Sequence, residues 1–161
     1  MTTNFSDVIR TAAAEFEADV SHLSNHGPRL WVSAARALGL LTRLREDPEI
    51  SMRRLVDLTA IDREGDPRRF EVIYRLHSPS LNQALRVHVD VDESELVVDS
   101  AFELWPSANW LEREVFDLFG IEFRAHPDLR RILLDPDFEG APLRKDYPRQ
   151  PDLALPKVGE S

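Results

Sequence analysis

The chain has 161 residues, 42% of them hydrophobic and 30% charged, a balance typical of one soluble globular domain. Its formal net charge of −9 argues against nucleic-acid binding, which depends on clustered lysine and arginine. The sequence contains no cysteine, which excludes disulfide bonds, thiolate zinc sites and cysteine-ligated iron–sulfur clusters within this chain. The first residues are polar and acidic, so we expect neither a secretory signal nor a membrane-spanning helix there.

The N-terminal part predicts two amphipathic helices separated by a short strand. Apolar residues recur at helical spacing over residues 5–16, and residues 2–4 offer capping side chains. After the break at His26-Gly27-Pro28, residues 30–32 have the pattern of a strand. Residues 33–45 then return to helical spacing, with a serine as the candidate cap, and Pro48 ends this second helix.

From about residue 54 the hydrophobic period changes to two, which predicts an antiparallel meander. The expected strands are residues 55–61, 70–76 and 85–91, with residues 96–98 as a candidate extension of the same sheet and turns at residues 65–67 and around Pro79. Arg86, His88 and Asp90 alternate with apolar residues, so one sheet face is expected to meet solvent while helices cover the other. The predicted fold class is two-layer α+β, with a mostly antiparallel sheet.

The C-terminal part predicts one more helix and then a segment of different composition. A helix is expected after Ser107, its candidate cap, and Gly120 suits a left-handed stop. Six of the eleven prolines lie in residues 126–161, among scattered charges and few apolar residues. Such a segment does not build a core of its own but can lie extended along another surface. We therefore expect an α+β domain of residues 1–125 and an extended, proline-rich, partner-docking tail of residues 126–161.

The last predicted helix carries an acid within its apolar face. A helical wheel places Glu112 among the core-facing residues, whereas Arg113, Glu114 and Asp117 lie on the opposite side with Trp110. A buried carboxylate is costly unless it is paired, so Glu112 is expected to meet an arginine or backbone donors. Trp110 on a charged face is a candidate partner contact, with coverage by the chain's own tail as the alternative.

Other patterns that carry chemistry are weak in this sequence. His22 and His26 have the spacing of a helical metal pair, but no third ligand is evident. The acids between Asp90 and Glu95 lack the glycine and the terminal acid of a calcium loop. Phosphate-binding glycine loops, nucleophile elbows and kinase signatures are absent from the sequence. The only enzymatic alternative is acid–base chemistry on Glu112, and a structural role for this acid is favoured.

An ordered set of motifs covers the C-terminal two thirds of the chain. It begins with residues 55–62, is densest at Trp105-Pro-Ser-Ala-Asn-Trp-Leu-Glu-Arg-Glu-Val-Phe-Asp-Leu-Phe-Gly-Ile121, and continues through Phe123, His126-Pro127, residues 129–133 and residues 140–148. In order and spacing these motifs resemble the C subunit of the NADH:quinone oxidoreductases, respiratory complex I. The equivalent subunit of membrane-bound hydrogenases and formate hydrogenlyase-type complexes shares the pattern and stays as an alternative.

The resemblance implies a cofactor-free structural subunit of the peripheral arm, on the cytoplasmic side of the cell membrane. Such a subunit packs against the large D subunit and neighbouring iron–sulfur subunits, while FMN, iron–sulfur clusters, NADH and quinone are bound elsewhere in the complex. The implied structural signature is Glu112, Arg113, Glu114, Asp117 and Gly120. The implied partner interface is Trp110, His126, Arg130, Arg131, Arg144, Lys145, Asp146 and Tyr147. No catalytic residue is expected in this chain.

Overall fold

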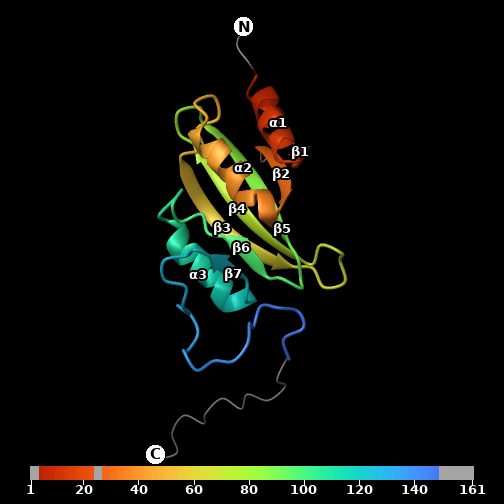
Figure 1. Cartoon of the computed structure of the whole chain (residues 1–161), viewed down its shortest axis with the longest axis vertical. Helices are drawn as coiled ribbons and strands as arrows, with labels where there is room; N and C mark the ends of the chain where they lie inside the picture. Colours follow the sequence, from red (N-terminus) through yellow and green to blue (C-terminus); the bar gives the residue numbers. More distant parts are fainter. Residues whose placement is uncertain (1–3, 24–26, 149–161) are drawn as a thin grey trace, which may run out of the picture.

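A five-stranded sheet with helices over one face forms the body of the protein (Figure 1). The structure is a computed structural model that describes residues 4–23 and 27–148. In chain order the elements are α1 (Phe5–Glu15), β1 (Asp19–Leu23), β2 (Gly27–Ser33), α2 (Ala34–Glu46), β3 (Arg54–Asp62), β4 (Phe70–Ser78), β5 (Gln83–Val91), β6 (Val97–Asp99), α3 (Ala108–Phe119) and β7 (Glu122–Arg124). The two-layer α+β class predicted from the sequence is confirmed.

The strand order is β1-β2-β5-β4-β3, and most neighbours are antiparallel. The meander of β3, β4 and β5 matches the period of two in the sequence. Strand β2 joins it by pairing in parallel with β5, which the meander pattern alone did not indicate. The expectation that residues 96–98 extend this sheet was wrong, because β6 pairs instead with β7 in a separate two-stranded parallel sheet. Strands β1 and β7 were not predicted.

One face of the large sheet carries the apolar core. Alternate residues of β2, β5, β4 and β3 point to the helices, so that Leu30, Val87, Tyr74 and Leu58 are almost fully buried. Helix α2 contacts β2 and β5 on this face, and α3 contacts β3. The helices meet the same core through Ile9, Ala12, Leu40, Leu41, Leu44, Val115 and Phe119. All three helices therefore lie in one layer over the sheet.

The opposite sheet face is less exposed at its centre than the alternation of β5 predicts. His88 was expected to face solvent but is only 4% exposed, and Glu71 beside it is fully buried. The Trp31 ring stacks on the His88 ring with centroids 4.5 Å apart. A hydrogen bond joins His88 Nδ1 to Glu71, which also pairs with Arg63. The expectation failed here because neighbouring side chains on the same face cover the imidazole.

The predicted capping residues stand at the helix ends, but not all of them make capping hydrogen bonds. Asn4 caps α1 by accepting a hydrogen bond from the Ser6 N–H at 3.3 Å. Ser33 and Ser107 precede their helices as predicted, but neither side chain makes a capping hydrogen bond. Gly120 ends α3 with φ +73°, the left-handed conformation that glycine adopts without steric cost.

Beyond β7, the described part of the tail, residues 126–148, contains no helix or strand. In Figure 1 this segment, drawn in blue, leaves β7 and runs beside α3. The Leu143 N–H donates a hydrogen bond to the Leu118 carbonyl at 3.0 Å, and Leu129 packs against the core. Helix α3 therefore contacts the core on one side and the tail on another, and the rest of the helix faces solvent. The rest of the predicted tail, residues 149–161, lies outside the described residues, as does His26 of the weak histidine pair.

Candidate functional site

The surface formed by α3 and residues 126–148, here called the α3–tail surface, is organised around a buried carboxylate. Asp117 is fully buried although the helical wheel placed it on the solvent side, because the tail crosses that side. Its Oδ2 accepts hydrogen bonds from three successive tail N–H groups, those of residues 132, 133 and 134, at 3.1, 2.8 and 3.0 Å. Arg131 Nη1 donates to the other oxygen at 2.6 Å.

These contacts determine the charge state of Asp117. Burial alone would raise its pKa, but the hydrogen bonds from Leu134, Arg131 and Leu133 favour the ionised carboxylate and lower the pKa to about 2. The group is therefore a permanent anion at neutral pH. A carboxylate that accepts consecutive backbone N–H groups fixes the path of the tail at this point.

Arg113 is the second residue of α3 that the tail covers. It is 7% exposed, whereas the wheel placed it among solvated charges. Its guanidinium donates to two tail carbonyls, from Nε to Arg130 at 3.0 Å and from Nη2 to Arg131 at 3.3 Å. The guanidinium carbon also lies 5.1 Å from the centre of the Trp110 ring. Trp110 itself is 64% exposed, so the described tail does not cover this ring.

Glu112, on the core side of α3, is fully buried without an arginine partner among the described residues. Of the two partners expected for it, the backbone donor is present. Oε1 accepts from the Ala101 N–H at 2.7 Å, and Oε2 accepts from the Ser100 hydroxyl at 2.6 Å. Burial outweighs these two hydrogen bonds and raises the pKa of Glu112 to about 7. Both oxygens are engaged inside the fold, which leaves no acceptor directed to solvent.

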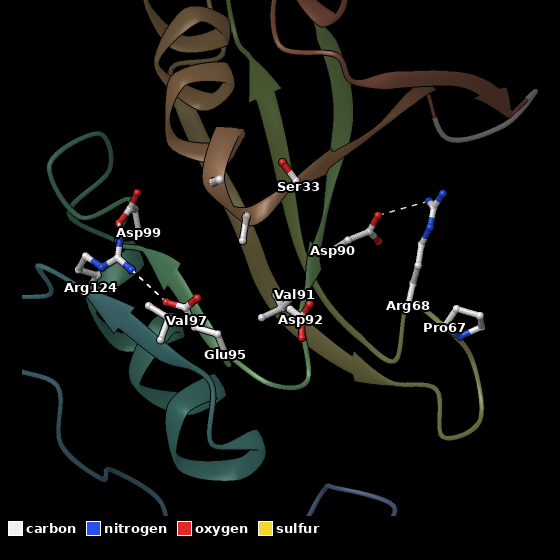
Figure 2. A pocket seen from close by; sticks show the side chains of 12 residues that line it. Ser33, Pro67, Arg68, Asp90, Val91, Asp92, Glu95, Val97, Asp99 and Arg124 are labelled. Carbon is white, nitrogen blue, oxygen red and sulfur yellow. Dashed lines mark hydrogen bonds and ion pairs between the residues drawn. The ribbon is translucent and has the colours of Figure 1, made fainter.

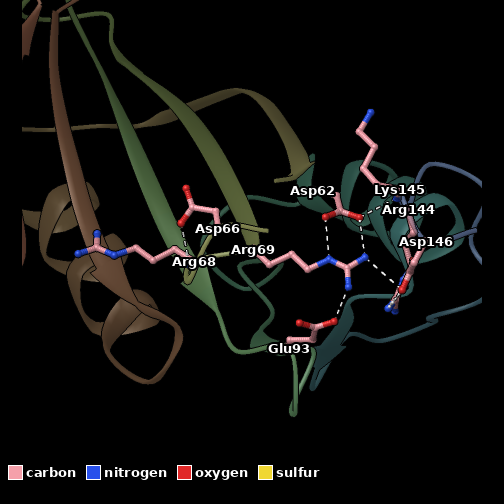
Figure 3. Close-up of polar contacts among 8 residues, drawn as sticks. All are labelled: Asp62, Asp66, Arg68, Arg69, Glu93, Arg144, Lys145 and Asp146. Carbon is pink, nitrogen blue, oxygen red and sulfur yellow. Dashed lines mark hydrogen bonds and ion pairs between the residues drawn. The ribbon is translucent and has the colours of Figure 1, made fainter. Parts of the chain in front are cut away.

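A second buried acid, Asp62 at the end of β3, holds the far part of the tail (Figure 3). The Lys145 N–H donates to Asp62 Oδ2 at 2.7 Å. Arg69 spans the same carboxylate, with Nε 2.9 Å from Oδ1 and Nη2 3.1 Å from Oδ2. The Arg69 guanidinium also pairs with Glu93 and, at 3.1 Å, with Asp146 of the tail. Arg69 therefore joins three carboxylates, one at the end of β3, one just beyond β5 and one in the tail.

The tail contributes its own ion pair to this cluster. Arg144 donates from Nε and Nη2 to the two oxygens of Asp146, each at 3.0 Å. Hydrogen bonds from Arg144 and then Arg69 lower the pKa of Asp146 to about 2, and the hydrogen bond from Arg69 lowers the pKa of Asp62. The Phe70 ring lies 4.6 Å from the Arg69 guanidinium carbon and 5.0 Å from that of Arg144. The segment around Asp146 is thus held at the start of β4 by the ion pair with Arg69 and by the contact of Arg144 with the Phe70 ring.

Two open hollows mark the surface of the described chain. One of about 440 Å³ lies between the end of α3 and the tail, lined by Phe116, Gly120, Arg131, Gly140, Ala141, Arg144, Asp146, Tyr147 and Pro148. The other, of about 420 Å³, lies away from the tail at the start of α2, between Asp90 and Asp99 (Figure 2). Its arginines are already paired, Arg68 with Asp90 at 3.3 Å and Arg124 with Asp99 at 3.3 Å.

The residues expected at the partner interface fall into three groups. Trp110, Arg130, Lys145 and Asp146 are exposed, and Arg131, Arg144 and Tyr147 are half-buried. The His126 side chain is buried, with Nε2 3.2 Å from the Asn109 carbonyl oxygen. Of the signature residues, Glu112, Arg113 and Asp117 are buried, Gly120 ends the helix, and Glu114 is exposed. All of them lie on α3 or on the tail beside it.

Sequence reasoning missed Asp62 and Arg69, which hold the tail from the sheet. Asp62 closes the predicted strand 55–61, and Arg69 stands beside Arg68 at the start of the next strand. No local pattern connects them to Lys145, which lies 83 positions beyond Asp62. The one available signal was that Asp62 continues the alternation of Leu58 and Ala60, because an acid on a core-facing side requires a donor.

The fold and this surface together define a two-layer α+β domain that carries an ordered C-terminal segment on its helical side. The chain belongs to the family described as respiratory-chain NADH dehydrogenase, 30 Kd subunit, whose model matches residues 30–152. Among the described residues, no group of His, Cys, Asp or Glu could hold a metal ion. Within the same residues, no helix is long and apolar enough to cross a membrane.

Curated relatives are named as the C subunit of NADH-quinone oxidoreductase. The chain is 45% identical over 119 residues to that of Rhodopseudomonas palustris, covering 74% of this chain and 58% of the relative. It is 51% identical over 113 residues to that of Cereibacter sphaeroides, covering 70% of this chain and 56% of the relative. The chain therefore spans less than two thirds of the length of these relatives.

Solved structures show the same fold. A trypsin-resistant fragment of Nqo5, residues 1–134, superposes with a TM-score of 0.69 at 27% identity, covering 78% of this chain and 100% of the fragment. A chain of the membrane-bound sulfane sulfur reductase, an archaeal respiratory membrane complex, superposes with a TM-score of 0.73 at 21% identity, covering 89% of this chain and 85% of that one. The second likeness concerns the fold alone.

Proposed function

We propose that this chain is a cofactor-free scaffold subunit in the peripheral arm of a proton-translocating NADH:quinone oxidoreductase. In this role it packs against the D subunit near the quinone-reducing end, on the cytoplasmic side of the membrane. Electrons pass from NADH through FMN and iron–sulfur clusters on other subunits to quinone. The names of the curated relatives favour this complex over the equivalent subunit of a membrane-bound hydrogenase.

The main observation in support of the scaffold role is the exposed Trp110 ring on the α3–tail surface. The ring keeps 64% of its area in solvent while the Arg113 guanidinium lies against it. Arg113 is in turn held by two tail carbonyls, so the ring is positioned before any partner arrives. Tryptophan and arginine are enriched among the residues that dominate binding energy at protein interfaces.

The surroundings of Glu112 support the scaffold role over the acid–base enzyme. A catalytic acid must come within hydrogen-bonding distance of a substrate. The Glu112 carboxylate is fully buried, and its two oxygens accept from Ser100 and Ala101 of the chain itself. Burial raises the pKa of Glu112, and this burial supports a structural role for the acid at the contact between α3 and the core.

The test is copurification of the tagged full-length chain from gently solubilised membranes, with the other subunits quantified by mass spectrometry. Trp110→Ala is expected to lower the yield of the D subunit at least about tenfold, the effect of removing a central aromatic anchor. Leu81→Ala is the matched control, because Leu81 is also an exposed apolar residue, 39% exposed, but lies in the β4–β5 turn. Equal recovery of the D subunit with both variants would remove the α3–tail surface from the interface.

A further inference from the structure

Three arginines stand side by side on the sheet face that the helices leave open. Arg75 of β4 is the register partner of Arg86 in β5, and Arg86 is the register partner of Arg29 in β2. Directly paired residues of neighbouring strands point to the same face, with strands about 4.8 Å apart. The three side chains, here called the arginine row, therefore extend across about 10 Å of one sheet surface.

The arginine row has no ion-pairing partner among the residues that the structure describes. None of its side chains makes a hydrogen bond or an ion pair with any residue that the structure describes, and the Nε of Arg29 is buried without an acceptor. Arginines nearby behave differently: Arg63 pairs with Glu71 and Arg68 pairs with Asp90. Like charges directly opposite each other on neighbouring strands are destabilising. On a chain with net charge −9, three adjacent cations on one sheet face are a local exception.

The surroundings of the arginine row have the composition of a protein interface. In the next row of the same face lie Ile73 and Trp31, both half-buried, with Trp31 stacked on His88. Arginine and tryptophan are enriched where proteins bind each other, and arginine binds carboxylates through two parallel hydrogen bonds. The register partner of Arg75 on β3 is an acid, Asp57, so the cationic surface ends at this edge and is three arginines wide. These neighbours favour a polypeptide over a lipid surface or nucleic acid.

We propose that the arginine row is a second docking surface, which binds the acidic face of a helix in a neighbouring polypeptide. The spacing supports a helix. Acids at positions i, i+4 and i+7 of a helix stand about 5–6 Å apart, close to the spacing of the strands that carry the arginines. Acids on one face of an extended strand are about 6.8 Å apart. This spacing is too wide for all three acids to reach the three arginines, which stand on strands about 4.8 Å apart. The helix would lie across β2, β5 and β4.

The test uses the isolated full-length chain and two synthetic helical peptides of equal composition. One peptide carries its glutamates on a single helical face, and the other has the same glutamates dispersed around the helix. Binding is followed by backbone amide shifts in NMR spectra. The single-face peptide is expected to shift amides of β2, β4 and β5 and to bind at least about tenfold more tightly than the dispersed isomer, because three charge-assisted pairs form together.

Two variants with the same loss of charge make the test specific. The triple variant Arg29→Gln, Arg75→Gln, Arg86→Gln is expected to weaken binding of the single-face peptide at least about tenfold, since the paired charges are removed. The control replaces Arg10, Arg36 and Arg45 of α1 and α2 with Gln, which lowers the charge equally in the helical layer. It should change the affinity less than about twofold. If the triple variant does not fold, Arg75→Glu, at an exposed position, takes its place.

Two outcomes would overturn the proposal. One is equal peptide affinity in the triple variant and the control. The other is that phosphatidylglycerol vesicles or duplex DNA, but not the peptide, shift the amides of the arginine row. The identity of the partner as a neighbouring subunit rests on the proposed function, whereas peptide binding does not. Peptide binding that depends on the row, combined with no D subunit copurifying with the wild-type chain, would contradict the proposed function alone.

Discussion

Glu112 shows how one buried acid makes the stability of the fold depend on pH. Its pKa is about 7 in the folded chain and about 4.5 ordinarily, so the folded state binds more protons than the unfolded state between these values. Stability from this group is therefore full below about pH 4.5 and falls as the pH rises to about 7. The difference corresponds to roughly 3 kcal/mol in the free energy of unfolding.

Replacing Glu112 with Gln removes this titration while an amide can still hydrogen-bond Ser100 and Ala101. We expect the free energy of unfolding of Glu112→Gln, relative to wild type, to increase by roughly 3 kcal/mol between pH 4.5 and pH 8. Urea unfolding at a series of pH values measures this difference. Parallel pH profiles for the two proteins would mean that folding does not change the pKa of Glu112.

The stability that Asp117 contributes depends on pH in the opposite direction, because folding lowers its pKa to about 2. Its contribution is full above its ordinary value of 3.8 and is lost as the pH falls through about 2. Asp117→Asn removes the charge that Arg131 and three tail N–H groups share. We expect a loss of about 3 kcal/mol at neutral pH, the effect of breaking a buried ion pair, which shrinks toward acid pH.

Hydrogen exchange locates this effect in the tail. Amides of residues 132–134 donate to Asp117, and in Asp117→Asn they should exchange faster than in wild type. Asp137→Asn serves as the control, because Asp137 is an exposed acid of the same tail. Unchanged protection of these three amides in Asp117→Asn would show that other contacts hold the tail on α3.

Among the elements, those specified by local pattern were predicted well. The helix from Phe5 follows from its apolar spacing and its Asn4 cap, and α3 ends at Gly120 as expected. Strands β3, β4 and β5 follow from their period of two. Each of these patterns lies within about ten neighbouring residues, where propensity and periodicity act.

Pairings between distant segments were the part that the sequence did not predict. Strand β2 joins β5 in parallel, and β6 leaves the main sheet for β7. On α3, a helical wheel separates a core side from a solvent side, but the tail turns the solvent side of Arg113 and Asp117 into a second buried side. A wheel contains no information about a segment that arrives from elsewhere in the chain.

Two glycines with similar φ angles allow the stability cost of backbone strain to be distinguished from the cost of a steric clash. Gly65 has φ +86° with no atom within 4 Å of an added Cβ, whereas Gly140 has φ +91° and would place that Cβ 2.6 Å from the Tyr147 ring. Gly65→Ala should cost about 1 kcal/mol from the left-handed conformation alone. Gly140→Ala should cost at least about 1 kcal/mol more in urea unfolding, because the Tyr147 ring must move from Phe138. Equal losses would mean that Tyr147 is not packed there.

At the scale of the whole molecule, the tail is fastened to the body at two acids that lie far apart in the sequence. Asp117 holds residues 131–134 on α3, and Asp62 with Arg69 holds residues 145–146 on the sheet. Ordering a segment before it binds lowers the entropy cost of association. The α3–tail surface is therefore present in the free chain, which suits a subunit that joins a larger assembly.

Arg69→Gln tests the second fastening point. The change leaves the buried Asp62 carboxylate without its guanidinium, which should lower the free energy of unfolding and open the tail around Lys145. Hydrogen exchange at the Lys145 amide, the donor to Asp62, is expected to accelerate. Arg53→Gln, at an exposed arginine just before β3, should leave it unchanged. No difference between the two variants would mean that Arg69 does not hold the tail.

The central claim is that this chain is a scaffold subunit of an NADH:quinone oxidoreductase. The most direct test is the size of the particle in which the chain elutes after the membrane is solubilised. The tagged full-length chain is purified from gently solubilised membranes, passed over a sizing column, and its fractions are analysed by mass spectrometry. We expect it to elute in a large complex with the D subunit and the iron–sulfur subunits in fixed proportion. Elution of the whole population alone, near its own mass of 18.5 kDa, would contradict the account.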